Sequence, residues 1–158
     1  MSKILKFYRG EAPNTDGLLF DATVNLTDRQ MEIGHQWVQW MFPLPEPSKA
    51  HPSSPVMSSD DIAAFVSTPE LQVRARRALD RFQLFLANTT AWRRDRDHNH
   101  LRITRVIRFL SVIGMAEDAK AFCDWAIQTW ENANPGPLPV QTHRYWTEAL
   151  KAHPEWLN

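Results

Sequence analysis

The sequence has little cysteine or glycine, no excess charge of either sign and no long hydrophobic run. With Cys123 as the only cysteine among 158 residues, no disulfide can form within the chain, which fits a reducing compartment. No apolar stretch reaches membrane-spanning length, and residues 1–7 lack the apolar core and cleavage site of a signal peptide. We therefore expect a cytoplasmic protein that has no membrane partner.

The charge balance also argues against one class of function. Lysine plus arginine and aspartate plus glutamate number 18 each, so the formal net charge is zero. A general polyanion-binding domain would carry a clear basic excess. What the chain does have is 43% hydrophobic residues, including seven tryptophans and eight phenylalanines, which is enough for a sizeable core. We expect residues 1–158 to form a single domain.

The hydrophobic pattern predicts an all-α fold of six or seven helices. Strand-like alternation is nearly absent, whereas spacings of three and four recur along the chain. Residues 10–26 look irregular, and Pro43, Pro45 and Pro47 begin a proline-rich loop after a central helix. Helices are expected over residues 2–9, 28–42, 59–66, 69–88, 99–113, 116–133 and 140–152.

Several of these helices carry end signals. Thr27 and Thr68 are plausible N-caps, with Pro69 at the first position of the second of these helices. Ser58 and Asp61 have the spacing of a capping box. Gly114 can end the helix before it in a left-handed conformation.

The central helix, residues 28–42, is apolar nearly all round, which predicts a central place in the fold. His35 lies on its apolar face, either as a structural imidazole or as a base or ligand contact in a cavity under the proline-rich loop. Trp37 and Trp40 either pack in the core or form an aromatic wall for a ligand. Gln39 either adds a polar contact or faces the surface.

The stretch Asp97–Arg105 concentrates two histidines and two arginines at a helix start. His98, Arg102 and Arg105, at positions i, i+4 and i+7, would share one face and could clamp a carboxylate or phosphate. The alternative is an internal salt-bridge network, with its acids drawn from Glu11, Glu32, Glu46 or Asp97.

A metal site is a weaker interpretation of the same stretch. Asp97, His98 and His100 could ligate zinc or nickel, with His35 or His143 as a further ligand. A helix would turn His98 and His100 away from each other, so we predict neither a metal nor a cofactor.

Three blocks of the sequence carry a resemblance: Phe7-Tyr8-Arg9-Gly10-Glu11, the run from His35 to Ser48, and Asn99 to Ile107 with its end at Gly114. Together they resemble the N-terminal conserved domain of the opioid growth factor receptor family. The chain departs from the family pattern at residues 85–88, which lack the aromatic residue followed by glycine, and at residues 17–25, which lack a tryptophan.

The resemblance implies an all-α domain and supplies no established enzymatic activity. A short, free-standing version of this kind is expected from the bacterial or phage branch, and the opioid-peptide binding in the family name is not expected to transfer to it.

Our first functional hypothesis is a non-enzymatic binding module with its site between helices 28–42 and 99–113. Its ligand would be a small, nucleotide-like anion, or else an acidic or peptide partner. Arg102 and Arg105 would hold the anion, His98 and His100 would add hydrogen bonds, and Trp37 or Trp40 would form the wall. The full candidate set is His35, Trp37, Gln39, Trp40, His98, Asn99, His100, Arg102 and Arg105.

Two alternatives stay open at this point. One is a hydrolase or transferase acting on a phosphorylated substrate, with His35 or His100 as the base. The other is nucleic-acid binding through the basic region from Arg74 to Arg96, which would show steep salt dependence.

Overall fold

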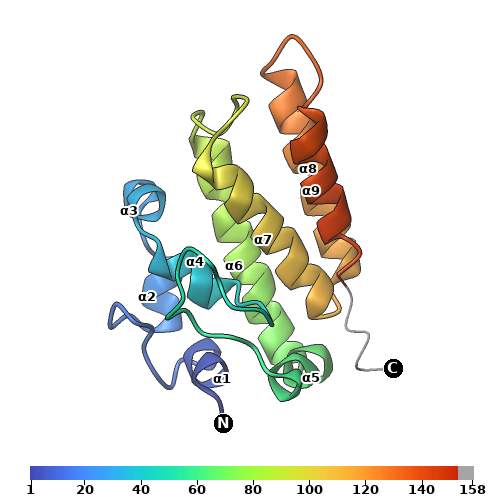
Figure 1. Ribbon diagram of the computed structural model, residues 1–158. Coiled ribbons are helices and arrows are strands. Elements are labelled where there is room, and N and C mark those ends of the chain that lie inside the picture. Colours follow the sequence, from blue (N-terminus) through green and yellow to red (C-terminus); the bar gives the residue numbers. More distant parts are fainter. Residues whose placement is uncertain (153–158) are drawn as a thin grey trace.

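The computed structural model describes residues 1–152, and its regular structure is entirely helical (Figure 1). The expected all-α class is confirmed, but the described residues form nine helices rather than six or seven. The helices are α1 (Lys3–Tyr8), α2 (Phe20–Val24), α3 (Asp28–Ile33), α4 (Gln36–Met41), α5 (Ser59–Ser67), α6 (Pro69–Asn88), α7 (His98–Val112), α8 (Ala116–Asn132) and α9 (Val140–Ala149). Among these helices, none is long and apolar enough to cross a bilayer.

Most of the predicted helix ends are confirmed. Thr27 and Ser58 both form capping boxes, closed by the side chains of Gln30 and Asp61. Gly114 has φ +82°, so it ends α7 in the left-handed conformation that glycine tolerates. Thr68 is at the predicted N-cap position and Pro69 begins α6, but the Thr68 side chain makes no capping hydrogen bond.

The predicted central helix over residues 28–42 is also wrong, because the chain breaks into α3 and α4. Gly34 has extended backbone angles (φ −81°, ψ 154°) and lies tightly against the preceding turn. A Cβ on Gly34 would lie 2.8 Å from the Gln30 carbonyl oxygen and 3.2 Å from the Trp37 ring. Side chains satisfy carbonyls at the break, since Trp37 Nε1 donates to Met31 O at 2.9 Å.

Residues 10–26 are not wholly irregular as predicted, because they contain α2. This helix has only five residues, too few to show a helical period in the sequence. It buries Phe20, whose ring packs 4.9 Å from Tyr8 and 5.7 Å from Phe7 (centroid to centroid). The burial of one aromatic side chain between neighbouring rings thus stabilises a helix that propensity alone would not form.

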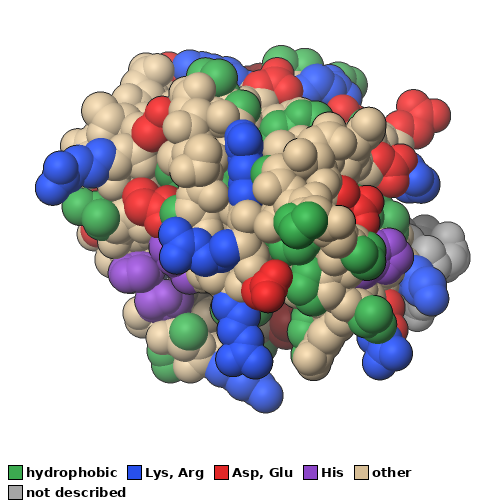
Figure 2. All heavy atoms as spheres, turned by 90° about the horizontal axis from the view of Figure 1, so that it is seen from above, with side chains coloured by type: hydrophobic (Ala, Val, Ile, Leu, Met, Phe, Trp, Pro, Cys, Tyr) green, Lys and Arg blue, Asp and Glu red, His purple; other side chains and the backbone are tan. Residues whose placement is uncertain are grey.

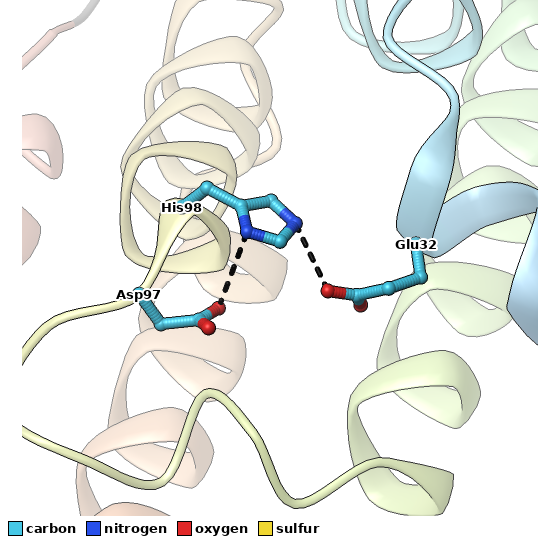
Figure 3. A group of neighbouring side chains, drawn as sticks. All are labelled: Glu32, Asp97 and His98. Carbon is cyan, nitrogen blue, oxygen red and sulfur yellow. Dashed lines mark ion pairs between the residues drawn. The ribbon is translucent and has the colours of Figure 1, made fainter.

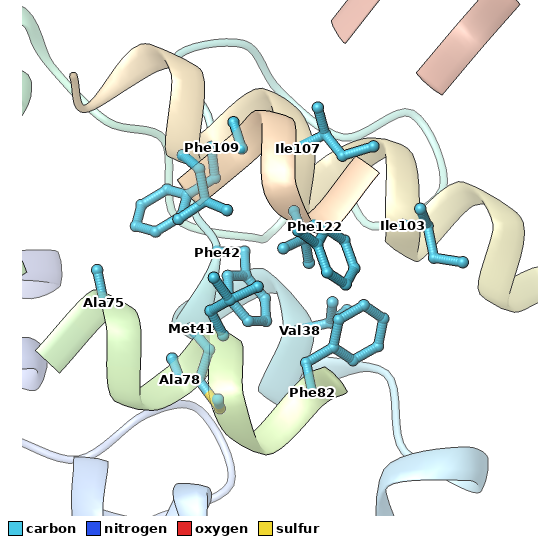
Figure 4. Close-up of a cluster of buried hydrophobic side chains, with 14 of the residues drawn as sticks. Val38, Met41, Phe42, Ala75, Ala78, Phe82, Ile103, Ile107, Phe109 and Phe122 are labelled. Atoms are coloured by element: carbon cyan, nitrogen blue, oxygen red, sulfur yellow. The ribbon is translucent and has the colours of Figure 1, made fainter. Parts of the chain in front are cut away.

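The hydrophobic core lies where α4, α6, α7 and α8 meet (Figure 4). Phe82 of α6 is its centre, with ring centroids 5.8 Å from Phe42, 5.9 Å from Trp37 and 6.0 Å from Phe122. The inner face of α7 contributes Ile103, Ile107 and other buried side chains, and the helix also packs against α8 and α9. The opposite face of α7 is therefore left to line the surface.

Candidate anion-binding cavity

A cavity of about 440 Å³ lies between α4, the outer face of α7 and the loop of residues 43–57. An isolated bridge between Leu44 and Val56 joins the two ends of this loop, and Met57 N donates to Leu44 O at 2.9 Å. The lining residues are aliphatic (Val38, Leu44, Ala50, Leu101), neutral polar or imidazole (His35, Gln39, Ser48, His51, His98, Thr104) and cationic (Arg102, Arg105, Arg108).

The structure brings His98, Arg102 and Arg105 to this one cavity, as their helical spacing predicted. Leu101 and Arg108 complete the row on the same side of α7. In the space-filling view, histidine side chains gather beside Lys or Arg side chains on one side of the molecule (Figure 2). The three cations nevertheless have very different partners.

Arg102 is held by the protein itself. Its Nη1 donates to Met31 O at 2.8 Å and to Asn99 Oδ1 at 3.1 Å, and its Nη2 donates to Gly34 O at 2.5 Å. The guanidinium also lies 5.0 Å from the centroid of the Trp37 ring. Burial lowers the pKa of Arg102, although nearby acids oppose the shift. Arg102 therefore fixes the break between α3 and α4 rather than offering both nitrogens to a ligand.

Arg105 is the cavity arginine that combines two unused terminal nitrogens with the absence of a direct carboxylate partner among the described residues. Its Nε donates to Phe42 O at 2.7 Å, and the described part of the chain supplies no hydrogen-bond acceptor for Nη1 or Nη2. Burial lowers the pKa of Arg105 to about 10, with the charge of Glu46 acting in the opposite direction. Arg108, by contrast, is paired with Glu46. A half-buried guanidinium without a direct carboxylate partner is thus exposed to the cavity.

The histidines lie around the same space. The rings of His35 and His51 are stacked, with centroids 5.4 Å apart. His98 lies between two carboxylates: its Nε2 is 3.0 Å from Glu32 and its Nδ1 is 3.9 Å from Asp97 (Figure 3).

The three residues weighed as metal ligands, Asp97, His98 and His100, do not come together. His100 Nε2 bonds to Trp92 O at 2.6 Å, away from the other two. Glu32, Asp97 and His98 do lie close enough to share an ion. The two ring nitrogens of His98 face different carboxylates, Nε2 towards Glu32 and Nδ1 towards Asp97 (Figure 3).

Gln39 is the least satisfied group in the cavity wall. The residue is 6% exposed, and its Oε1 has no hydrogen-bond partner within residues 1–152. An unpaired buried polar atom costs free energy, so such atoms often mark a position that a ligand or water completes.

Four predicted site residues lie outside the cavity lining. Trp37 and Trp40 are buried, and Trp40 Nε1 donates to the Thr15 hydroxyl at 2.8 Å. Both point away from the cavity because Val38 and Gln39 occupy the other side of the same helix. Asn99 is buried and donates to Glu32 at 3.1 Å while accepting from Arg102. His100, the fourth, bonds to a backbone carbonyl and lies edge-on to Trp146.

Sequence reasoning missed the contribution of the proline-rich loop. Leu44, Ser48, Ala50 and His51 all line the cavity. A loop has no hydrophobic period that assigns its side chains to a face, and only the expectation of a cavity beneath the loop pointed to them.

In the basic region from Arg74 to Arg96, the arginines of α6 are paired with acids, whereas Arg93 and Arg94 donate to backbone carbonyls. Arg76 lies 3.2 Å from Asp118, Arg77 lies 2.6 Å from Asp21, and Arg81 lies 2.8 Å from Asp28. The acids come from α8, α2 and α3, so the charges of this helix face are balanced by neighbouring elements.

Comparison with known proteins places the chain in a family. Residues 2–129 match the model of the opioid growth factor receptor conserved region. The chain belongs to the opioid growth factor receptor family.

The human opioid growth factor receptor is 31% identical over 134 residues, covering 70% of this chain and 20% of the human protein. The mouse receptor is also 31% identical, covering 70% of this chain and 21% of the mouse protein. The chain thus spans about a fifth of the length of these relatives. No solved structure matches it.

Proposed function

We propose that the cavity between α4, α7 and the 43–57 loop binds a small anionic ligand, or the anionic group of a peptide or protein partner, without catalysing a reaction. The observation that carries this proposal is Arg105, a half-buried cation whose two terminal nitrogens face no acceptor among the described residues. An anion there would pair with a charge that the fold has already partly desolvated.

The size and lining of the cavity support a ligand site. About 440 Å³ lies within the range of small-molecule pockets, which combine apolar walls with a few placed polar groups. The relatives are named as receptors, which agrees with a binding role. Because the chain covers only a fifth of them, their name supports binding in general and does not identify the ligand.

The enzymatic alternative has less support. His35 lines the cavity, but its contact is a stacked imidazole, His51, and the described residues place no carboxylate against it to orient a base. His100 is bonded to the Trp92 carbonyl, outside this cavity. The hypothesis of nucleic-acid binding also has less support, because Arg76, Arg77 and Arg81 are paired with carboxylates.

Calorimetric titration with inorganic phosphate, AMP and a set of carboxylates tests the proposal, after native mass spectrometry has shown whether the purified protein retains a ligand. We expect at least one anion to bind in a 1:1 complex and to lose tenfold or more in affinity in Arg105→Gln. Arg96→Gln removes the same charge from an exposed position outside the cavity, so it should bind as the wild type does. Equal binding by both variants, or no binding of any anion by the apo protein, would refute the proposal.

A further inference from the structure

We infer that the ligand of this cavity is an amphipathic monocarboxylate, with one carboxylate head and an apolar body. This inference rests on the proposed function and narrows it, because it excludes polyphosphates and nucleotides as the preferred ligands. Three observations lead to it: the charge available in the cavity, the apolar surface beside that charge, and the unpaired amide in the wall.

Three arginines line the cavity, but within the described part of the chain only Arg105 has neither a direct carboxylate partner nor terminal nitrogens that are already hydrogen-bonded to the protein. Arg102 spends both terminal nitrogens on Met31 O, Asn99 Oδ1 and Gly34 O. Arg108 is neutralised by Glu46. Polyphosphates are held by several cations or by a ring of backbone N–H groups, and the lining of this cavity includes no glycine-rich loop to supply the latter. A single anionic group matches the one free pair of terminal donors, which belongs to Arg105.

The free part of Arg105 also fits the shape of a carboxylate. Its Nε is occupied by Phe42 O at 2.7 Å, so the ligand meets the end-on pair of Nη1 and Nη2. Two parallel N–H donors of this kind match the two oxygens of one carboxylate in a bidentate pair.

Apolar surface lies next to this charge. Leu101 precedes Arg105 by one helical turn and is 74% exposed, which is unusual for a leucine that lines a cavity. Val38, Leu44 and Ala50 add aliphatic surface from α4 and the loop. An apolar body bound beside Arg105 would remove this surface from water, a gain that inorganic phosphate could not provide.

Gln39 supplies the third observation. Its side-chain amide is in the wall of the same cavity, the residue is almost fully buried, and its Oε1 has no partner among the described residues. An amide can turn either its oxygen or its NH₂ group towards a neighbour, so it can donate to a carboxylate that Arg105 holds. The site thus combines polar and aliphatic groups, as an amphipathic ligand requires.

Octanoate is a suitable probe, tested by calorimetry against acetate, octanol, AMP and inorganic phosphate. Acetate keeps the head without the body, and octanol keeps the body without the charge. We expect octanoate to bind in a 1:1 complex at least tenfold more tightly than each of the other four. Arg105→Gln should weaken octanoate binding tenfold or more, while Arg96→Gln should not change it.

A second variant keeps the test valid if Arg105→Gln does not fold. Leu101→Asp changes an exposed side chain, so the thermal midpoint should stay near that of the wild type, while octanoate binding should be lost. Octanoate binding that survives Leu101→Asp or Arg105→Gln would overturn the inference. Binding of AMP or phosphate that depends on Arg105, without binding of octanoate, would also overturn it but leave the proposed function standing. Failure of every anion would refute both.

Discussion

Among individual residues, Tyr8 is the clearest case of a side chain that the fold requires in one protonation state. The residue is fully buried, its ring packs 4.8 Å from Phe65, and its hydroxyl donates to the Met41 carbonyl. Burial raises the pKa of Tyr8 well above its usual value of 10.0, because the phenolate would lose its hydration.

Replacing Tyr8 with Phe should therefore have an effect that changes with pH. At pH 8 we expect the free energy of unfolding to fall by about 1 kcal/mol, since the Met41 carbonyl loses its donor. A raised folded pKa means that the contribution of Tyr8 is complete below pH 10 and is lost as pH rises further, by about 1.4 kcal/mol per pH unit. Urea unfolding of both proteins between pH 8 and 11 measures this. Parallel stability curves would show that the Tyr8 phenol ionises freely in the folded protein.

Cys123 should be chemically inert in the folded protein. It is fully buried on α8, and its pKa is raised to about 11, first by burial and then by Asp124, with Lys120 opposing. Since the thiolate is the reactive form, we expect almost no reaction with a disulfide reagent at pH 8. The same protein in guanidinium chloride should react rapidly with one equivalent, and rapid reaction without denaturant would contradict the burial of the thiol.

At the scale of the elements, the break between α3 and α4 depends on the absence of a side chain at Gly34. The methyl group of an alanine at this position could not avoid the Gln30 carbonyl oxygen, which would lie 2.8 Å away, or the Trp37 ring at 3.2 Å. We expect Gly34→Ala to lower the free energy of unfolding by roughly 1–3 kcal/mol, as overpacking in a tight site does. Gly136→Ala is the matched control, because nothing lies within 4 Å of its new Cβ and its backbone is not left-handed. Urea unfolding that gives equal stabilities for the two variants would rule out a steric role for Gly34.

The elements that could be predicted are those with local signals. The long helices α6, α7 and α8 follow from hydrophobic periodicity, and the capping boxes at Thr27 and Ser58 follow from short motifs. The break at Gly34 could not be predicted, since the donors that replace the helical hydrogen bonds come from Trp37 and from Arg102, 68 residues away from Gly34. Without those distant donors, an apolar run over residues 28–42 favours one continuous helix.

The same limit applies to the site. Helical spacing placed His98, Arg102 and Arg105 on one face, and the cavity has them there. Helical spacing could not show that Arg102 is bonded within the protein whereas Arg105 has free donors. The backbone acceptors of Arg102 are carbonyls that are free only where α3 ends. Nor could helical spacing assign Trp37 and Trp40, whose side of the helix depends on what α4 packs against.

For the whole molecule, the zero net charge and the ion pairs made by the arginines of α6 predict that nucleic acid will not bind. The cations of α6 face acids from α2, α3 and α8, so they release few counterions from a phosphate backbone. Fluorescence anisotropy with labelled duplex and single-stranded DNA should show no saturable binding at near-physiological salt, and Arg77→Ala should change nothing. Saturable binding that falls steeply with salt and is lost in Arg77→Ala would favour nucleic-acid binding over the proposed function.

The proposed carboxylate site also predicts how binding depends on pH across the whole molecule. Only the protonated guanidinium of Arg105 attracts an anion, and burial lowers its pKa to about 10. A bound carboxylate stabilises the charged form, so the pKa of Arg105 should rise in the complex and the affinity should fall as pH rises past 10 in the free protein. Between about pH 8 and 9 the affinity for octanoate should be constant, and above pH 10 it should drop by up to tenfold per pH unit.

Calorimetry at pH 8, 9, 10 and 10.5 measures this, with circular dichroism to verify at each pH that the protein stays folded. Arg105→Lys tests the assignment, because a lysine keeps a positive charge but loses the paired donors of the guanidinium. Its affinity for octanoate should already be reduced at pH 8. An affinity in the wild type that falls between pH 6 and 8 would instead assign the anion contact to His35, His51 or His98, whose imidazoles line the same cavity.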